Sequence, residues 1–253
     1  MEKLFKKKIV LLTGAAGLLG TQFAKTFNNN KNFECVCVDI DEKKLDVLKK
    51  NLKSNNIHFF KCDIRNISKL ISLRNKLKNK KIFINTIINN AAINPTPNKK
   101  TDNWENEIEI GIKGAVNVIS AFSEDMIKKK QGNIINIGSD LSVIAPNQEL
   151  YKKAKINFIK PLSYSVIKHG IVGLTKYYAS LYGKHNIRCN CLSPGGINFK
   201  LKKKLVRQIS NVIPLKRMAN IDEYNDAILF LCSEGTKYMT GQNIIIDGGR
   251  SII

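Results

Sequence analysis

Arginine, histidine and tryptophan are scarce in this chain, and their scarcity narrows what the protein can be. Only six of its 42 basic residues are arginines, and its 253 residues include three histidines and one tryptophan. Proteins that read nucleic-acid sequence rely heavily on the bidentate arginine fork. The net charge of +22 is therefore better explained by lysines spread over solvated faces. We do not expect nucleic acid as a partner, although RNA binding by a basic patch stays open as a minor alternative.

The chain also lacks a Cys-x-x-Cys pair and any long apolar run. With few histidines as well, this composition predicts no metal site. No stretch approaches the roughly 20 apolar residues that a membrane-spanning helix needs. We expect a cytoplasmic protein with no membrane contact, whose cysteines are buried free thiols. They are Cys35, Cys37, Cys62, Cys189, Cys191 and Cys232.

No linker rich in proline, glycine or serine divides the chain, and short apolar segments alternate with helical ones. The expected strands are 8–13, 33–39, 57–62, 82–89, 133–138, 187–192 and 243–246. Apolar strands that alternate with helices are typical of a parallel sheet covered on both faces. We predict an α/β fold: one doubly wound Rossmann domain over residues 1–253, with helices on both faces of the sheet.

Two long connections interrupt the alternation. Residues 141–162 and 194–218 both leave the carboxyl ends of predicted strands. Ligands bind at these ends in such sheets, and long connections there are usually functional. We therefore expect both segments to be insertions on the substrate side.

A glycine-rich turn joins the first strand to the first helix. It reads Thr13-Gly-Ala-Ala-Gly-Leu-Leu-Gly20. Glycine lets backbone N–H groups approach a pyrophosphate, and the helix N-terminus adds a favourable dipole. We therefore predict a nucleotide-phosphate site, although a plain structural turn has the same pattern. The residues expected at the cofactor are Gly14, Ala16, Gly17, Leu18 and Leu19.

Asp39 ends the second strand, 19 residues after Gly20. A carboxylate at this place accepts hydrogen bonds from ribose hydroxyls and repels a 2′-phosphate. The neighbouring Ile40-Asp41-Glu42 offers no cation to offset that repulsion. We expect NAD rather than NADP, unless Asp39 only caps the helix that follows.

Tyr164 and Lys168 are four residues apart in a predicted helix, so their side chains share one face. An ammonium beside a phenol favours the phenolate and lowers the pKa of the hydroxyl. The pair predicts a general acid/base. On its own it is also compatible with an ordinary helix face that carries an exposed lysine.

Eight segments in order give the chain a specific resemblance to the short-chain dehydrogenase/reductase family over nearly its whole length. They are Thr13–Gly20, Asp39, Cys62-Asp63-Ile64, Asn89-Asn90-Ala91-Ala92, Ile134–Ser139, Tyr164 with Lys168, Ser193-Pro194-Gly195-Gly196, and Met239–Gln242 leading to Asp247-Gly248-Gly249. The resemblance implies a seven-stranded sheet, a nicotinamide cofactor and a homotetramer or homodimer.

The resemblance also implies roles for single residues. Ser139 would hydrogen-bond the substrate oxygen, Tyr164 would be the acid/base, and Lys168 would bind the nicotinamide ribose and lower the tyrosine pKa. Asp63 and Ile64 would lie at the adenine. The other implied cofactor contacts are Asn90, Ala91, Pro194, Gly195 and Ile197.

Three features depart from the family pattern. The glycine spacing is G-x-x-G-x-x-G, Gly111 stands where the family has a catalytic asparagine, and Ser139 precedes Tyr164 by 25 residues. Gly111 puts the usual proton relay through water in doubt. Together the departures resemble a subgroup associated with bacterial surface-carbohydrate and flagellin-glycan modification.

The expected function is NAD-dependent interconversion of a secondary alcohol and a ketone on a sugar or sugar derivative. Lysines at 152, 153, 155, 200 and 202–204 favour an anionic sugar, or simply form a solvated surface. A 3-oxoacyl carrier-protein reductase is an alternative, because the basic surface suits an acidic carrier. A non-catalytic nucleotide sensor is another, kept open by Gly111.

Overall fold

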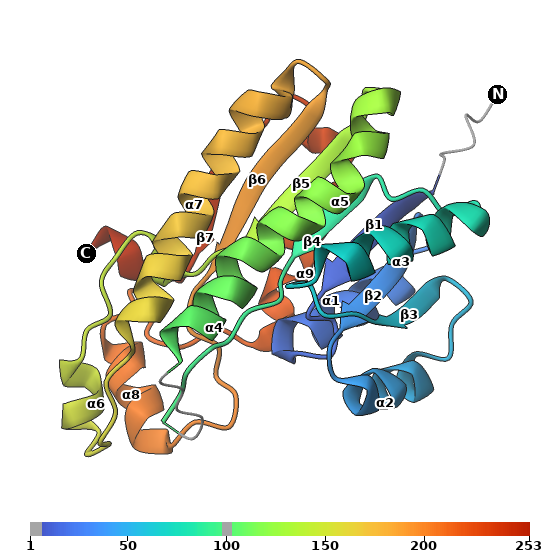
Figure 1. The fold of residues 1–253 in the computed structure, drawn as a ribbon. Coiled ribbons are helices and arrows are strands. Elements are labelled where there is room, and N and C mark those ends of the chain that lie inside the picture. The colour runs from blue at the N-terminus through green and yellow to red at the C-terminus, as the bar shows by residue number, and fades with distance from the viewer. Residues whose placement is uncertain (1–6, 98–102) are drawn as a thin grey trace.

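The computed structural model describes residues 7–97 and 103–253, which form one seven-stranded sheet (Figure 1). All the strand pairs are parallel, in the order β3-β2-β1-β4-β5-β6-β7. The strands are β1 Lys8–Thr13, β2 Phe33–Asp39, β3 Ile57–Lys61, β4 Thr86–Asn89, β5 Gly132–Ile137, β6 Ile187–Pro194 and β7 Asn243–Ile246. The predicted parallel α/β fold is confirmed.

Helices cover both faces of the sheet because the strands are apolar on both sides. On one face, α1, α2 and α9 share one apolar core with the strands, and on the other face α3, α5 and α7 share a second (Figure 1). The helix bounds are α1 Leu18–Asn28, α2 Glu42–Leu52, α3 Ile67–Asn79, α4 Trp104–Ile108, α5 Gly114–Lys129, α6 Glu149–Lys153, α7 Leu162–Gly183, α8 Lys203–Asn211 and α9 Asn225–Cys232.

The strand order reverses at β1, which pairs with β2 on one side and β4 on the other. The connections after β1 and β4 therefore leave in opposite directions and open a crevice at their carboxyl ends. Thr13 ends β1 at this crevice, and Asn89 ends β4. The topology thus positions the glycine turn and the residues from Asn89 to Ala92 beside each other.

The predicted helix over 104–130 is not one regular helix. A π-helical turn, Glu109–Lys113, separates α4 from α5, and Gly111 lies at its centre. Turns of this kind inside α-helices are frequent at functional sites. The sequence pattern gave no sign of it, because Glu109–Lys113 keeps the spacing of the helices on either side.

Both predicted insertions lie at the carboxyl ends of the strands, and they contact each other. The first contains a 3₁₀ turn, Asp140–Ser142, and α6, and the second contains α8. Helices α6 and α8 pack side by side at the same end of the molecule (Figure 1). Together they form a lobe beside the crevice.

All six cysteines are buried free thiols, as predicted, and the Sγ atoms of Cys35 and Cys37 lie 3.7 Å apart on one face of β2. Across residues 7–97 and 103–253 we find no cluster of three potential metal ligands. Within the same ranges no helix combines the length and apolarity that crossing a membrane requires.

Gly14, at the crevice, has both a backbone conformation and surroundings that disfavour a side chain. Its φ is +62°, and a Cβ built there would lie 2.7 Å from the backbone Cα of Ala91. We expect Gly14→Ala to destabilise the fold by more than about 1 kcal/mol, from strained backbone and crowding combined. Thermal unfolding measures this, with Gly183→Ala as control because no atom lies within 4 Å of that position. Equal stability of both variants would contradict the packing.

Candidate active site

Every residue predicted for the site lines one cleft of about 760 Å³ at the carboxyl ends of the strands. A cleft of this size is typical of small-molecule and cofactor sites. The residues it brings together are Gly14, Ala16, Gly17, Leu18, Leu19, Asp39, Asp63, Ile64, Asn90, Ala91, Ser139, Tyr164, Lys168, Pro194, Gly195 and Ile197. Their shared location agrees with the sequence prediction, while their individual roles remain proposals.

Asp39 is tied to the glycine turn rather than to the following helix. Its carboxylate accepts hydrogen bonds from the backbone N–H of Ala16 at 2.9 Å and of Asp41 at 3.0 Å. The side chain that caps α2 is Asp41, which accepts from the N–H of Lys44. The capping interpretation of Asp39 is therefore wrong, and its carboxylate faces the cleft.

Cations do lie near Asp39 in space, contrary to the expectation from its neighbours in sequence. Lys44 and Arg65 both line the cleft. Each is already paired with a carboxylate, Lys44 with Asp41 at 2.6 Å and Arg65 with Asp63 at 2.7 Å. The guanidinium of Arg65 lowers the pKa of Asp63, which stays ionised.

Thr13 holds the two sides of the crevice together. Its Oγ1 accepts the N–H groups of Asn90 and Ala91 at 3.1 and 3.2 Å. The side-chain amide of Asn90 donates in return to the carbonyls of Thr13 and Gly14, both at 3.0 Å. These bonds lock β1 to β4 where a nucleotide would cross the sheet. The sequence analysis quoted Thr13 only as part of the turn and missed this role.

Tyr164 and Lys168 lie in the first two turns of α7, both buried, with the ammonium 5.7 Å from the tyrosine ring centroid. Lys168 Nζ donates to the carbonyl of Ile137, at the end of β5, at 2.8 Å. Burial raises the pKa of the Tyr164 hydroxyl, an effect that the Ser139 hydroxyl opposes. Burial also lowers the pKa of Lys168 to about 8. The phenol is therefore protonated in the free protein.

Ser139 belongs to a series of polar contacts that runs through Asp140 to Arg250. Its Oγ donates to Asp140 Oδ1 at 2.8 Å, and Asp140 Oδ2 pairs with Arg250 at 2.7 Å. The side chains of Asp140 and Arg250 are only 4% and 13% exposed. Asp140 and Arg250 line the cleft with Tyr151 of α6. The sequence analysis gave none of the three a role, although Tyr151 lies in the segment 141–162 that it placed on the substrate side.

Lys160 also lines the cleft, and the sequence analysis gave it no role. It is 8% exposed, and its ammonium donates to Asn94 Oδ1 at 2.6 Å and to the carbonyl of Pro95 at 2.7 Å. It also lies over the ring of Tyr164, 3.8 Å from the centroid. Burial, and then repulsion from Lys168, lower the pKa of Lys160 to about 7.

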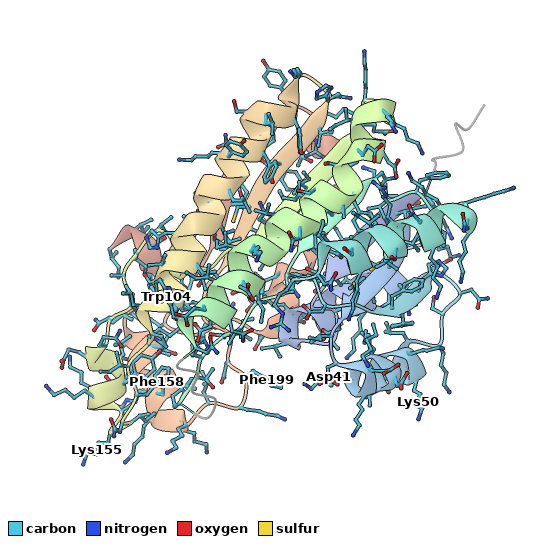
Figure 2. All side chains as sticks on the ribbon, in the orientation of Figure 1. Asp41, Lys50, Trp104, Lys155, Phe158 and Phe199 are labelled. Carbon is cyan, nitrogen blue, oxygen red and sulfur yellow. The ribbon has the colours of Figure 1, made fainter. Side chains whose placement is uncertain are left out.

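The other lysines of the first insertion do not belong to the site. Lys152, Lys153 and Lys155 are exposed, and the label of Lys155 lies at the outer edge of the molecule in Figure 2. Of the lysines proposed in the second insertion, Lys200 lines the cleft. Among the lysines weighed for an anionic substrate, Lys200 is therefore the one that the cleft retains.

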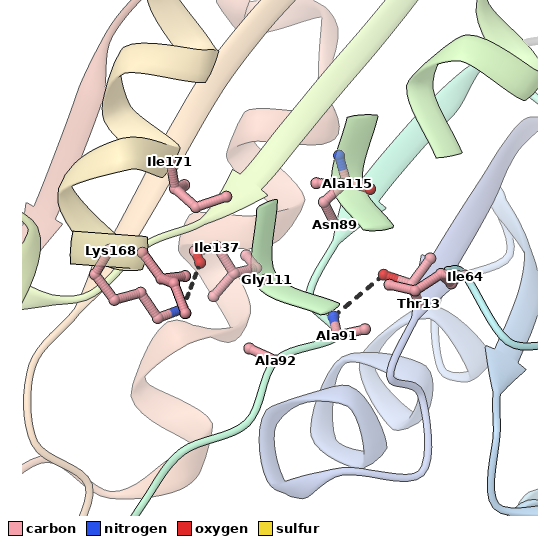
Figure 3. A pocket seen from close by; sticks show the side chains of 11 residues that line it. Thr13, Ile64, Asn89, Ala91, Ala92, Gly111, Ala115, Ile137, Lys168 and Ile171 are labelled. Atoms are coloured by element: carbon pink, nitrogen blue, oxygen red, sulfur yellow. Dashed lines mark hydrogen bonds between the residues drawn. The ribbon is translucent and has the colours of Figure 1, made fainter. Parts of the chain in front are cut away.

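Gly111 is packed against Ile167, the residue just before Lys168. A Cβ built at Gly111 would lie 2.6 Å from Ile167 Cγ2. Beside them is a cavity of about 10 Å³, which also borders Lys168 and Asn89 (Figure 3). That volume is about one water molecule. The usual asparagine is therefore not merely absent, because Ile167 occupies the space that its side chain needs.

The geometry defines a class of protein before any comparison: a Rossmann oxidoreductase with a tyrosine–lysine centre. A family model described as enoyl-(acyl carrier protein) reductase matches residues 14–251. A 3-oxoacyl-[acyl-carrier-protein] reductase of Buchnera aphidicola subsp. Baizongia pistaciae is 30% identical over 96% of this chain and 97% of its own. The corresponding reductase of Thermotoga maritima is 29% identical over 97% and 98%.

A solved short-chain dehydrogenase of Leptospira borgpetersenii with bound NAD⁺ is also similar. It is 27% identical, covers 98% of this chain and 94% of its own, and superposes with a TM-score of 0.85. The chain belongs to the short-chain dehydrogenase/reductase family, whose members are NAD(P)-dependent oxidoreductases that act on CH–OH groups.

The contact between Gly111 and Ile167 predicts that placing the family's asparagine at position 111 destabilises the protein unless Ile167 is also changed. We expect Gly111→Asn to lower the free energy of unfolding by about 1 to 3 kcal/mol, because the core is overpacked and Ile167 is stiff at χ1. In an Ile167→Ala background the same change should cost at least about 1 kcal/mol less. Denaturant unfolding of the four proteins of this cycle measures the coupling, and additive costs would contradict the contact.

Lys160 predicts a pH dependence of stability. Its pKa is about 7 in the folded protein and about 10.4 when unfolded, so the unfolded chain binds more protons between these values. Stability should therefore rise with pH across this window, and less so in Lys160→Gln, which does not titrate. Thermal melts between about pH 6 and 10 test this, with exposed Lys153→Gln as control. Parallel curves for wild type and Lys160→Gln would contradict it.

Proposed function

We propose that the protein is an NAD-dependent oxidoreductase that interconverts a secondary alcohol and a ketone on a sugar or sugar derivative. The observation that carries the proposal is the buried polar array at the substrate end of the cleft. It comprises Ser139, the Asp140–Arg250 ion pair, Lys160 and Tyr164. These polar groups suit a substrate that carries several hydroxyl groups, because an apolar chain would displace water from them without offering hydrogen bonds in return.

The cleft fits a dinucleotide by its own geometry. Gly14 leaves the turn open, Asp39 faces the ribose position, and the length of the cleft reaches from Asp63 to Lys168. A bound nicotinamide would accept or supply hydride at C4. The chain's own residues manage the proton. Tyr164 gives it to the carbonyl oxygen in reduction or takes it from the hydroxyl in oxidation, and Ser139 orients that oxygen.

Lys168 gives the proton step a fixed geometry. Its ammonium is anchored to the end of β5 through the Ile137 carbonyl, and it shares the buried site with Tyr164. A positive charge at this distance favours the phenolate and offsets the cost of burying it. The small cavity beside Lys168 is roomy enough for one water molecule, which would take the place of the usual relay.

A second candidate is a 3-oxoacyl carrier-protein reductase. The names of the relatives favour it, as does an apolar wall on the α8 side of the cleft. That wall consists of Phe199, Leu201, Leu205, Ile209 and Met218. Initial rates with NADH on a 3-oxoacyl thioester and on a panel of keto sugars and sugar nucleotides separate the two candidates. A strong preference for the thioester would overturn the sugar proposal.

A homodimer or homotetramer is part of the proposal. The outer face of α7 exposes Val166, Tyr177 and Leu181, and a row of apolar side chains on a helix suits contact with a second copy. Sedimentation equilibrium tests this. A cytoplasmic location and a place in surface-glycan synthesis remain predictions, and the latter rests on the three departures from the family pattern.

Tyr164 is the first residue to test. We expect Tyr164→Phe to reduce turnover by about 10² to 10⁴, the usual contribution of a general acid/base. NADH affinity should change by less than about tenfold, because only the hydroxyl is lost. Tyr238→Phe, at a fully exposed tyrosine outside the cleft, is the matched control and should keep full activity. Turnover that survives in Tyr164→Phe would sink the mechanism.

Asp39 predicts the cofactor preference. Its carboxylate would repel a 2′-phosphate, and the nearby Lys44 and Arg65 are already paired. We expect NADH to bind at least about tenfold more tightly than NADPH, a difference of about 1.4 kcal/mol. Asp39→Asn should narrow the gap, whereas Asp46→Asn, exposed on α2, should not. Fluorescence titration measures both affinities, and tighter binding of NADPH to the wild type would contradict this reading.

A further inference from the structure

Lys160 is a buried charge to which the usual tyrosine–lysine mechanism gives no role. It lies four residues before Tyr164, just ahead of α7, and its two hydrogen-bond acceptors are neutral oxygens of Asn94 and Pro95. Burying an ammonium costs free energy unless its surroundings use the charge. The position of Lys160 therefore needs an explanation beyond packing.

The contact between Lys160 and Tyr164 explains why the charge is buried at this position. The Lys160 ammonium is 3.8 Å from the centroid of the tyrosine ring, and that of Lys168 is 5.7 Å away. Of the two cations, Lys160 therefore lies closer to the centre of the ring, and its attraction to the ring is the stronger because electrostatic attraction weakens with distance. A cation over a ring face is itself attractive, and it favours the ionised phenolate still more.

We propose that Lys160 is a positioning residue for the acid/base step, which stabilises the ionised form of Tyr164 and ties its ring to segment 94–95. This inference rests on the proposed role of Tyr164. In oxidation the substrate O–H bond breaks and its proton forms the Tyr164 O–H bond, while hydride leaves the carbinol carbon for the nicotinamide C4 of NAD. Lys160 neither gives nor takes this proton, and the phenolate that forms beside it favours its ammonium form. Reduction runs the same steps in reverse.

The charged groups around Lys160 are consistent with this role. Asp140 and Glu107 favour its ammonium form, and Lys168 opposes it. Neither carboxylate is free to pair with it directly, because Asp140 binds Arg250 and Glu107 accepts a hydrogen bond from Ser163, next to Tyr164. The strongest charge partner left for Lys160 is the phenolate of Tyr164, when it forms.

The titration of Tyr164 tests the inference without any substrate. Tyrosinate absorbs in the ultraviolet, and subtracting the spectrum of Tyr164→Phe isolates the signal of this residue from the other tyrosines. The titration is done with saturating NAD on wild type, Lys160→Gln, Lys160→Met and the exposed control Lys153→Gln. Glutamine keeps N–H donors for the hydrogen bonds to Asn94 and Pro95 but carries no charge. Its effect therefore reports the charge of Lys160 apart from these hydrogen bonds, which tie the side chain to segment 94–95. Melting curves verify that each variant is folded.

We expect the Tyr164 phenolate to form at the same pH in wild type and Lys153→Gln. In both Lys160 variants it should form about 1 to 3 pH units higher, the usual effect of one nearby charge. Coincident titrations of wild type and Lys160→Gln would overturn the inference, as would absence of the wild-type phenolate up to about pH 11. A shift in Lys160→Met alone would also overturn it, because the tether and not the charge would then matter.

Kinetics separate this inference from the proposed function. With a substrate from the screen, Lys160→Gln should move the pH profile of kcat with little change in KM. A higher KM for acidic substrates with an unmoved profile would identify Lys160 as an anion-binding residue and contradict the proposal. If Tyr164→Phe retains turnover, the proposed function fails instead, and the titration still reports whether Lys160 acts on Tyr164.

Discussion

The burial of Tyr164 with two lysines is the physical constraint on which the site depends. Loss of water alone raises the pKa of the phenol and lowers that of each ammonium, so each group taken singly favours its neutral form. Both ammonium groups lie within 6 Å of the centroid of the tyrosine ring, where their charges offset the cost of forming the phenolate. Burial thus couples the proton on Tyr164 to its neighbours, which is what an acid/base near neutral pH requires.

The sheet makes this burial possible by fixing the groups from several directions. Lys168 is held by the end of β5, the Ser139 chain by Asp140 and Arg250, and Lys160 by Asn94 and Pro95. Each anchor comes from a connection that leaves the carboxyl end of a strand. The side chains therefore sit on a rigid edge, while the lobe of α6 and α8 closes one side of the cleft. The substrate end combines fixed polar groups with an apolar wall.

Much of this was predictable from the sequence. Apolar runs such as Lys8–Thr13 and Phe33–Asp39 match the strands to the residue, because buried parallel strands need continuous apolar side chains. The glycine-rich turn was equally predictable, because few residue types other than glycine adopt a positive φ like that of Gly14. These features are local, and each can be predicted from a short sequence pattern.

Other parts of the site were not predictable, for physical reasons. Arg250 reaches Asp140 across 110 residues, a contact that no local pattern encodes. Lys160 is one of 36 lysines, and nothing in the chain marks it as the buried one. The Gly111–Ile167 contact depends on a π-helical turn within a regular helical pattern. In each case the role of the residue depends on a tertiary contact that the sequence pattern does not encode.

Direct observation of hydride transfer tests the central claim most sharply. NADH labelled with deuterium at nicotinamide C4 is mixed in a single turnover with a ketone from the substrate screen, using wild type and Tyr164→Phe. The account predicts deuterium on the carbinol carbon of the product with wild type. With the variant, transfer should be about 10² to 10⁴ times slower although NADH still binds. Equal rates of label transfer in the two proteins, or no transfer from NADH in the wild type, would contradict it.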